Sequence, residues 1–265
     1  MEEPHIDNKM FLSTGCSKLD SFLRGGLPRK GITQIYGESG TGKTQLALQF
    51  CLSAQIPKNS TDVGGVAYIC TEAAFPSSRL HELFKKSPLV KDYAISNEKI
   101  FIEHISNTEG LEDCIFQPDR LPTLLSMHKI KLLIIDSIAA TYRVEYDLMN
   151  VKSRAKSLRK VGYQLQKLSK IHEMAVVCIN QLYKSVEKMF VLAQVTAMMG
   201  NNYTENLSCK EQPSLGITWA SMVTNSFYLY KKFNHRYLFI TGSPYLPRKN
   251  IEYEIIESGI IGKDP

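Results

Sequence analysis

The sequence predicts an α/β protein in which helices flank a mostly parallel central sheet, with an antiparallel extension at the C-terminal end. Short β-rich apolar runs alternate with segments of helical periodicity in one continuous series from residue 11 onward. Several of these runs are uniformly apolar, which is typical of strands covered on both faces. After residue 217 the pattern changes to alternating strands joined by short turns, which indicates antiparallel pairing.

The parallel part of the sheet is expected to contain five short runs: Ile32–Tyr36, Val66–Cys70, Ile100–His104, Leu132–Ile135 and Ala175–Ile179. Helical patterns lie between them, most clearly at Lys43–Gln55 and Val151–His172. In the second, apolar residues recur at steps of three and four, and the charges off that stripe are nearly all basic.

The antiparallel extension is expected at Phe227–Lys231, Tyr237–Thr241 and Ile251–Ile255. The turns between these strands are expected at Asn234-His235 and at Gly242-Ser243-Pro244. A loop is predicted at Gly200–Ser214. The apolar spacing within Met189–Met199 leaves open a partner-binding helix, a loop segment or a core stripe.

The composition excludes several classes of protein. With 265 residues, 43% apolar and 22% charged, the chain can bury a sizeable core. Its apolar runs fall far short of the roughly 18 residues of a membrane span, and its first residues are acidic, so neither membrane insertion nor secretion is expected. The six scattered cysteines form no C-x-x-C pair and indicate reduced thiols, mostly buried, in a nuclear or cytoplasmic protein.

The positive charge is concentrated in one segment. Residues 143–190 contain ten Lys and Arg against four acidic residues, which accounts for the whole net charge of +6. Such a segment indicates a phosphate-rich partner such as nucleic acid. A solvated helix face would explain it equally well.

A phosphate-binding loop follows the first predicted strand. The residues Gly37, Glu38, Ser39, Gly40, Thr41, Gly42, Lys43 and Thr44 fit G-x-x-x-x-G-K-[ST] at every position, between a strand and a helix. Glycines let backbone N–H groups surround phosphates, Lys43 reaches the β and γ oxygens, and Thr44 is a ligand for Mg²⁺. The sequence lacks the Leu-Ser-Gly-Gly-Gln motif of transporter motors and the Asn-Lys-x-Asp motif of GTPases.

Two carboxylates are candidates to complete the site. Asp136 ends a buried strand and is predicted to hold the magnesium, although a cap or turn is the commoner role for such an aspartate. Glu72 follows the strand Val66–Cys70 at the expected carboxyl edge of the sheet, where open α/β sheets bind ligands. It is the best-placed general base, and the alternative is that it caps the next turn.

These residues, in this order, resemble the RecA-type recombinase ATPases of eukaryotes and archaea, and in particular their paralogues. The likeness runs from about Thr14 to Gly262. Its most specific stretches are Thr14–Asp20, the phosphate loop followed by Gln45, Tyr68–Arg79, Ile135-Asp136-Ser137 and Asn180-Gln181. The resemblance implies a RecA-like P-loop ATPase core over residues 11–265, after a polar tail at 1–10 and without the N-terminal helical domain common in the family.

The family also implies roles for single residues around bound ATP and Mg²⁺. Glu72 is expected to be the general base, and Gln181 to sense the γ-phosphate and couple it to the following loop. Gln45 is expected in the nucleotide site, Arg79 against the adenine, and Pro247 in a cap over nucleotide at a subunit interface. For Gln181, a buried loop anchor is the alternative interpretation.

The family's two DNA-contacting loops correspond to Arg143–Lys152 and Leu182–Gly216. Candidates for phosphate contact are Arg143, Arg154, Lys156, Arg159 and Lys184. Departures from strand-exchange enzymes favour an accessory role. The first loop lacks Gly-Arg-Gly character, the second ends in Leu215-Gly216 instead of paired glycines, and the Phe-x-x-Ala polymerisation element is replaced by Phe11-Leu12-Ser13-Thr14.

The resulting expectation is a weak, Mg-dependent ATPase that assists homologous recombination repair of double-strand breaks and crosslinks. Its expected partners are single-stranded or branched DNA, another recombinase paralogue and the main recombinase filament, in the nucleus and also the cytoplasm. The alternative is a non-hydrolysing adaptor in which ATP clamps a subunit interface.

Overall fold

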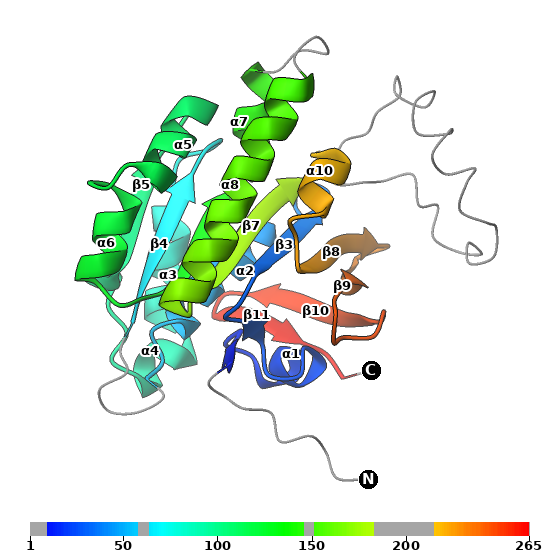
Figure 1. The fold of residues 1–265 in the computed structure, drawn as a ribbon. Coiled ribbons are helices and arrows are strands. Elements are labelled where there is room, and N and C mark those ends of the chain that lie inside the picture. Colours follow the sequence, from blue (N-terminus) through cyan, green and yellow to red (C-terminus); the bar gives the residue numbers. More distant parts are fainter. Residues whose placement is uncertain (1–9, 58–63, 146–150, 183–214, 265) are drawn as a thin grey trace, which may run out of the picture.

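A nine-stranded sheet with the order β11-β10-β9-β8-β3-β7-β6-β4-β5 runs through the molecule (Figure 1). The structure, a computed structural model, describes residues 10–57, 64–145, 151–182 and 215–264. The parallel strands are β3 (Ile32–Gly37), β4 (Gly65–Cys70), β5 (Ile100–His104), β6 (Ile130–Asp136), β7 (Ala175–Gln181) and β8 (Asn225–Lys232). The predicted mostly parallel α/β architecture is confirmed.

The sheet ends in three antiparallel pairings. The strands β9 (His235–Gly242), β10 (Asn250–Ile256) and β11 (Gly259–Gly262) follow β8 in order. The sequence grouped β8 with this extension, but β8 also lies parallel to β3, with Gly37 opposite Leu229. Reversal therefore begins at β9, and β11 was not predicted. A separate small sheet pairs β1 (Phe11–Leu12) with β2 (Leu27–Pro28).

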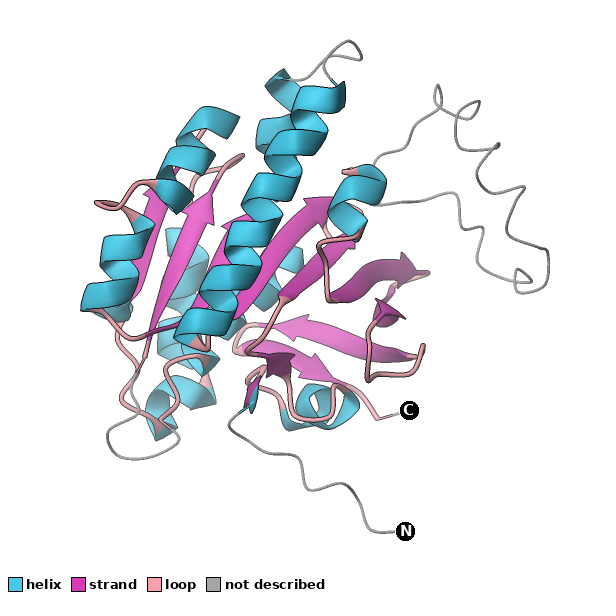
Figure 2. Cartoon of the chain, viewed as in Figure 1, coloured by secondary structure: helices cyan, strands magenta, loops and turns pink. Residues whose placement is uncertain are grey.

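Helices cover both faces of the parallel strands (Figure 2). The core on one face contains residues of α1 (Ser17–Phe22), α2 (Lys43–Ser53), α3 (Ser77–Lys86) and α4 (Pro88–Asp92), of which α1 packs against the antiparallel strand β11 and α4 packs against α2 and α3. The other packs against α5 (Thr108–Phe116), α6 (Leu121–Met127), α7 (Ile138–Glu145), α8 (Val151–His172) and α10 (Gly216–Ala220). A 3₁₀ turn, η2, spans Asn97–Lys99.

Alternation along β6 explains why its sequence is uniformly apolar. Leu132 and Ile134 enter the core beneath α2, whereas Leu133 and Ile135 enter the core beneath α8. Successive side chains of a strand point to opposite faces, so a strand covered on both sides needs apolar residues at every position. This two-sided burial leaves the ends of the strands as the places for polar chemistry.

The long helix α8 has its predicted bounds, but the apolar residues at its two ends are not buried. Leu158, Val161 and Leu165 are buried, whereas Val151 and Ile171 are 58% and 59% exposed. The predicted helix from Lys43 to Gln55 ends earlier, at Ser53. The predicted features at 189–199 and 200–214 lie outside the described residues, as do residues 1–9 of the predicted tail.

Four of the cysteines are buried free thiols: Cys51, Cys70, Cys114 and Cys178. Burial raises the pKa of the Cys70 and Cys114 thiols to about 12, so both are protonated at neutral pH. Cys16 is a half-buried free thiol, and Cys209 lies outside the described residues. Among the described helices, none combines the length and apolar character needed to cross a bilayer.

Candidate nucleotide site

The polar side chains predicted for the site follow four neighbouring parallel strands. The phosphate loop follows β3, Gln181 ends β7, Asp136 ends β6 and Glu72 comes just after β4. Register brings them level, because Gly37 is opposite Gln181 and Cys70 is opposite Asp136. The carboxyl ends of parallel strands share one edge of the sheet, so chain segments distant in sequence meet there.

The phosphate loop opens directly into α2. Gly42 is the N-cap residue, with φ of 104°, in the left-handed region that a side chain disfavours. A Cβ there would lie 2.6 Å from Ile255 Cδ1 of β10. Because Gly42 has no side chain to cap the helix, the N–H groups of the first turn are available to an anion. The loop therefore fits a phosphate group.

Lys43 folds back over this loop. Its Nζ donates hydrogen bonds to the Gly37 and Glu38 carbonyl oxygens, at 2.8 and 2.7 Å. Burial lowers the pKa of Lys43, and this effect is opposed by the negative charges of Asp136, Glu72 and Glu38. The ammonium group is thus held at the loop by neutral acceptors that a phosphate oxygen can replace.

Thr44 and Asp136 form the predicted pair of metal ligands. Thr44 Oγ1 donates to Asp136 Oδ2 at 3.0 Å, and the Tyr68 hydroxyl donates to the same oxygen at 2.8 Å. Burial raises the pKa of Asp136, against the opposing effect of these two hydrogen bonds and of Lys43. A hydroxyl and a carboxylate suit Mg²⁺, which completes its oxygen ligands with phosphate and water. Within the described residues there is no cluster of three His, Cys, Asp or Glu for a metal.

Glu72 and Gln181 are in direct contact. Gln181 Nε2 donates to Glu72 Oε2 at 2.6 Å, and Ser137 Oγ lies 3.4 Å from the same oxygen. Glu72 is exposed and Gln181 is half-buried. The structure thus joins the predicted general base to the predicted sensor of phosphate, although their roles stay predictions.

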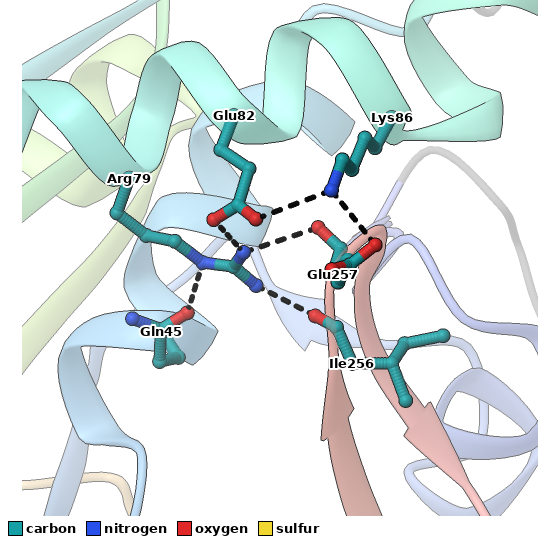
Figure 3. Close-up of polar contacts among 6 residues, drawn as sticks. All are labelled: Gln45, Arg79, Glu82, Lys86, Ile256 and Glu257. Carbon is teal, nitrogen blue, oxygen red and sulfur yellow. Dashed lines mark hydrogen bonds and ion pairs between the residues drawn. The ribbon is translucent and has the colours of Figure 1, made fainter.

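Arg79 lies on α3 beside the phosphate-loop helix (Figure 3). Its Nε donates to Gln45 Oε1 at 2.7 Å, so the two residues predicted for the nucleotide site touch. The guanidinium also pairs with Glu82 and donates to the carbonyl oxygens of Ile256 and Glu257. These contacts lie along the edge of the guanidinium, and packing of the adenine on its face stays a prediction.

Pro247 lies in the connection from β9 to β10 and is exposed. That connection follows the end of β9 nearest the start of β8, where Ser243 Oγ donates to Asn225 Oδ1 at 2.7 Å. The phosphate loop follows the opposite end of β3, parallel to β8. Pro247 and this chain's phosphate loop are therefore at opposite ends of the parallel strands, so Pro247 does not cap this chain's own nucleotide site, and its role over another subunit's nucleotide stays a prediction.

The basic candidates differ in exposure. Lys156 and Arg159 are exposed on α8, whereas Arg154 is half-buried and burial lowers its pKa. Arg143 lies in the last turn of α7, and its side chain is outside the described part of the structure. Lys184 also lies outside the described residues. Of this set, Lys156 and Arg159 are the side chains seen to be accessible to a phosphate backbone.

The sequence reasoning assigned no role to two tyrosines of the site. Tyr68 is buried in β4 and donates to Asp136, and Tyr253 is buried in β10 and donates to the Thr41 carbonyl oxygen at 2.5 Å. For Tyr68 the available signal was its place in an apolar, buried strand, where a tyrosine hydroxyl needs a partner, but this signal does not identify the partner. Tyr253 lies in a strand that is mostly not buried, so the sequence offered no such signal there.

The family comparison agrees with this geometry. The Rad51 family matches residues 6–263. The chain belongs to the Rad51 family. It is 34% identical over 278 residues to the bovine DNA repair protein XRCC3, an alignment that covers 98% of this chain and 77% of the bovine protein. Identity to mouse DNA repair protein XRCC3 is 41% over 222 residues, covering 80% of this chain and 60% of the mouse protein.

A relative from fission yeast, the DNA repair protein rhp57, is 31% identical over 281 residues, which cover 94% of this chain and 78% of that protein. The predicted RecA-like fold and the membership in the recombinase paralogues are thereby confirmed. The stretches Tyr68–Pro76, Leu215–Ala220 and Pro244–Pro247 resemble X-ray repair cross-complementing protein three more narrowly, and the identities to the bovine and mouse XRCC3 proteins confirm this resemblance.

Proposed function

We propose that this Rad51-family chain is an ATP-binding recombinase paralogue that assists homologous recombination repair of DNA double-strand breaks and crosslinks. One observation carries the proposal. Four parallel strands bring the phosphate loop, the Thr44–Asp136 pair and the Glu72–Gln181 pair to one edge of the sheet. Charge-stabilising and proton-accepting groups together at one edge are the requirements of phosphoryl transfer to water.

The residues of the site have different proposed roles. Lys43 and the first turn of α2 bind the phosphates, while Thr44 and Asp136 hold Mg²⁺. Bound Mg-ATP supplies the γ-phosphoryl group and the metal charge that offsets its negative oxygens. Gln181 can exchange its hydrogen bond to Glu72 for one to a phosphate oxygen. Glu72 is then free to accept a proton from the attacking water.

The proposed partners are DNA and a second recombinase paralogue, with the main recombinase filament as a further one. The exposed Lys156 and Arg159 support phosphate contact, and the position of Pro247 supports a nucleotide shared between subunits. Action in the nucleus is proposed because the relatives are named DNA repair proteins, and presence in the cytoplasm is proposed beside it.

The test is ATP hydrolysis by the purified chain, alone, with the partner paralogue and with single-stranded DNA. The control for contaminating ATPases is Lys43→Ala. We expect turnover that partner or DNA stimulates, and we expect Glu72→Gln to retain Mg-ATP binding while turnover falls by at least about a hundredfold, as for loss of a general base. Tight ATP binding without turnover in every mixture would replace this proposal with the non-hydrolysing clamp. Absence of ATP binding would refute both.

DNA binding is tested through its dependence on salt. Replacing Lys156 and Arg159 together by Gln removes two exposed charges, so the slope of log K against log salt should decrease by about 2 if both contact phosphates. The matched control is Lys167→Gln with Lys170→Gln, two exposed lysines toward the other end of α8. If both double variants kept the slope of the wild-type chain, Lys156 and Arg159 would belong to a solvated helix face.

A further inference from the structure

The guanidinium of Arg79 is held by three separate elements (Figure 3). From α2, Gln45 Oε1 accepts from Nε at 2.7 Å, and from α3, Glu82 pairs with Nη1. From the end of β10, the Ile256 carbonyl accepts from Nη2 at 2.6 Å and the Glu257 carbonyl accepts from Nη1 at 3.1 Å. Four of the five N–H donors of an arginine are thus used, all in the guanidinium plane.

The turn that supplies these two carbonyls belongs to the β10–β11 hairpin, which is itself fastened to the phosphate-loop segment. Tyr253 of β10 donates to the Thr41 carbonyl oxygen at 2.5 Å. Gln49 of α2 donates to the Ile260 carbonyl of β11 at 3.2 Å and accepts from the Ile260 N–H. The hairpin and α2 therefore form a stable unit on which Arg79 is placed.

An ion pair closes this arrangement on the side of α3. Lys86 Nζ lies 2.7 Å from a carboxylate oxygen of Glu257 and 3.6 Å from Glu82. Lys86 thus joins the residue that pairs with Arg79 to the turn whose carbonyls Arg79 binds. Neither Lys86 nor the Glu257 carboxylate touches the guanidinium, so any effect they have on it acts through the turn and Glu82.

We propose that Lys86 and Glu257 are positioning residues for the nucleotide base, because their ion pair holds the hairpin turn that fixes the plane of Arg79. The inference rests on the proposed ATP-binding function and assigns the base-side wall of that site to the C-terminal hairpin. Hydrogen bonds in the plane leave the faces of the guanidinium for an aromatic ring, and a plane fixed in advance loses less entropy when the ring binds. The Arg79 side chain is 18% exposed, so one part of it is open to a ligand.

The test compares two probes that differ in the base. Dissociation constants for Mg-ATP and for Mg-tripolyphosphate, which lacks base and sugar, are measured at low ionic strength because exposed ion pairs are screened by salt. The variants are Lys86→Met, Glu257→Gln and the two combined. The matched control is Lys85→Met, which changes the adjacent exposed lysine, a residue in no ion pair within the described part of the chain.

We expect each single variant to weaken Mg-ATP by about twofold to fivefold, the range of an exposed ion pair, and to leave tripolyphosphate unchanged. The combined variant should match Lys86→Met, because either single substitution removes the Lys86–Glu257 pair and only Lys86→Met also removes the longer contact with Glu82. Arg79→Ala should abolish the preference for ATP over tripolyphosphate. Urea unfolding checks that every variant is folded.

The inference would be overturned by equal losses for both probes, by additive losses in the combined variant, or by the same loss in Lys85→Met. The inference would also be overturned if Lys86→Met and Glu257→Gln bound Mg-ATP as the wild type does while Arg79→Ala bound it more weakly. Base binding would then depend on Arg79 and not on the ion pair. A wild-type chain that binds neither probe would instead refute the proposed ATP-binding function, so the two failures are distinguishable.

Discussion

Replacing Tyr253 by Phe removes one hydroxyl that joins the C-terminal hairpin to the phosphate loop. In the folded chain this hydroxyl is buried and donates to the Thr41 carbonyl oxygen at 2.5 Å. The ring stays in the hydrophobic core that the hairpin shares with α2, because Tyr253 is only 3% exposed and Phe fills nearly the same volume. The substitution therefore leaves a buried carbonyl without this partner and perturbs little else.

The cost follows from that unpaired acceptor. When a buried polar group loses its hydrogen bond, the free energy of unfolding decreases by about 1–3 kcal/mol. For a domain of 150–250 residues, 1 kcal/mol lowers Tm by about 2–4 °C, so a decrease of several degrees is expected for Tyr253→Phe. Because Thr41 precedes Gly42 and Lys43, we also expect weaker Mg-ATP binding, as the loop loses a support that fixes its backbone.

The measurements are Tm from thermal unfolding and the dissociation constant of Mg-ATP. The matched control is Tyr163→Phe, the same chemical change at a tyrosine that is 68% exposed on α8, and it should leave both values unchanged. A Tyr253→Phe variant as stable as the wild type and with the same ATP affinity would refute the conclusion that the hairpin supports the phosphate loop.

Three further substitutions have expected outcomes. Burial raises the pKa of Asp136, so its contribution to stability is full below the unfolded-state pKa and is lost as pH rises through the folded value. Asp136→Asn should therefore stabilise the nucleotide-free chain to urea at pH 7, flatten that pH dependence and abolish stabilisation by Mg-ATP; a less stable variant would contradict this account. Trp219→Phe removes the Nε1 donor to Gln34 Oε1, at 2.6 Å in the core, and should lower the unfolding free energy by about 1–3 kcal/mol; a stability equal to wild type would contradict it. Gly42→Ala requires a side chain at φ of 104° and 2.6 Å from Ile255 Cδ1, so it should weaken Mg-ATP at least tenfold, whereas Gly216→Ala, also at positive φ but with open space around it, should not.

Much of the site was predictable because its signals are local. The loop from Gly37 to Thr44 lies within eight consecutive residues, and Asp136 directly follows a run of buried residues in β6. Uniformly apolar runs predicted strands covered on both faces, and parallel strands bring their carboxyl ends together. The convergence of Thr44, Glu72, Asp136 and Gln181 follows from these facts and from the resemblance to the family.

The contacts across the hairpin could not be predicted in this way. Tyr253 and Thr41 are 212 positions apart, and Arg79 reaches carbonyls 177 and 178 positions away. Sequence shows that a buried hydroxyl or guanidinium needs partners, but backbone carbonyls are the same at every residue and leave no trace in the pattern. The sequence by itself thus determined which residues are predicted to bind phosphate and metal, through local spacing and polarity. Only the tertiary structure decided what holds Arg79 and the phosphate loop in place, because those partners meet only when the C-terminal strands pack against α2.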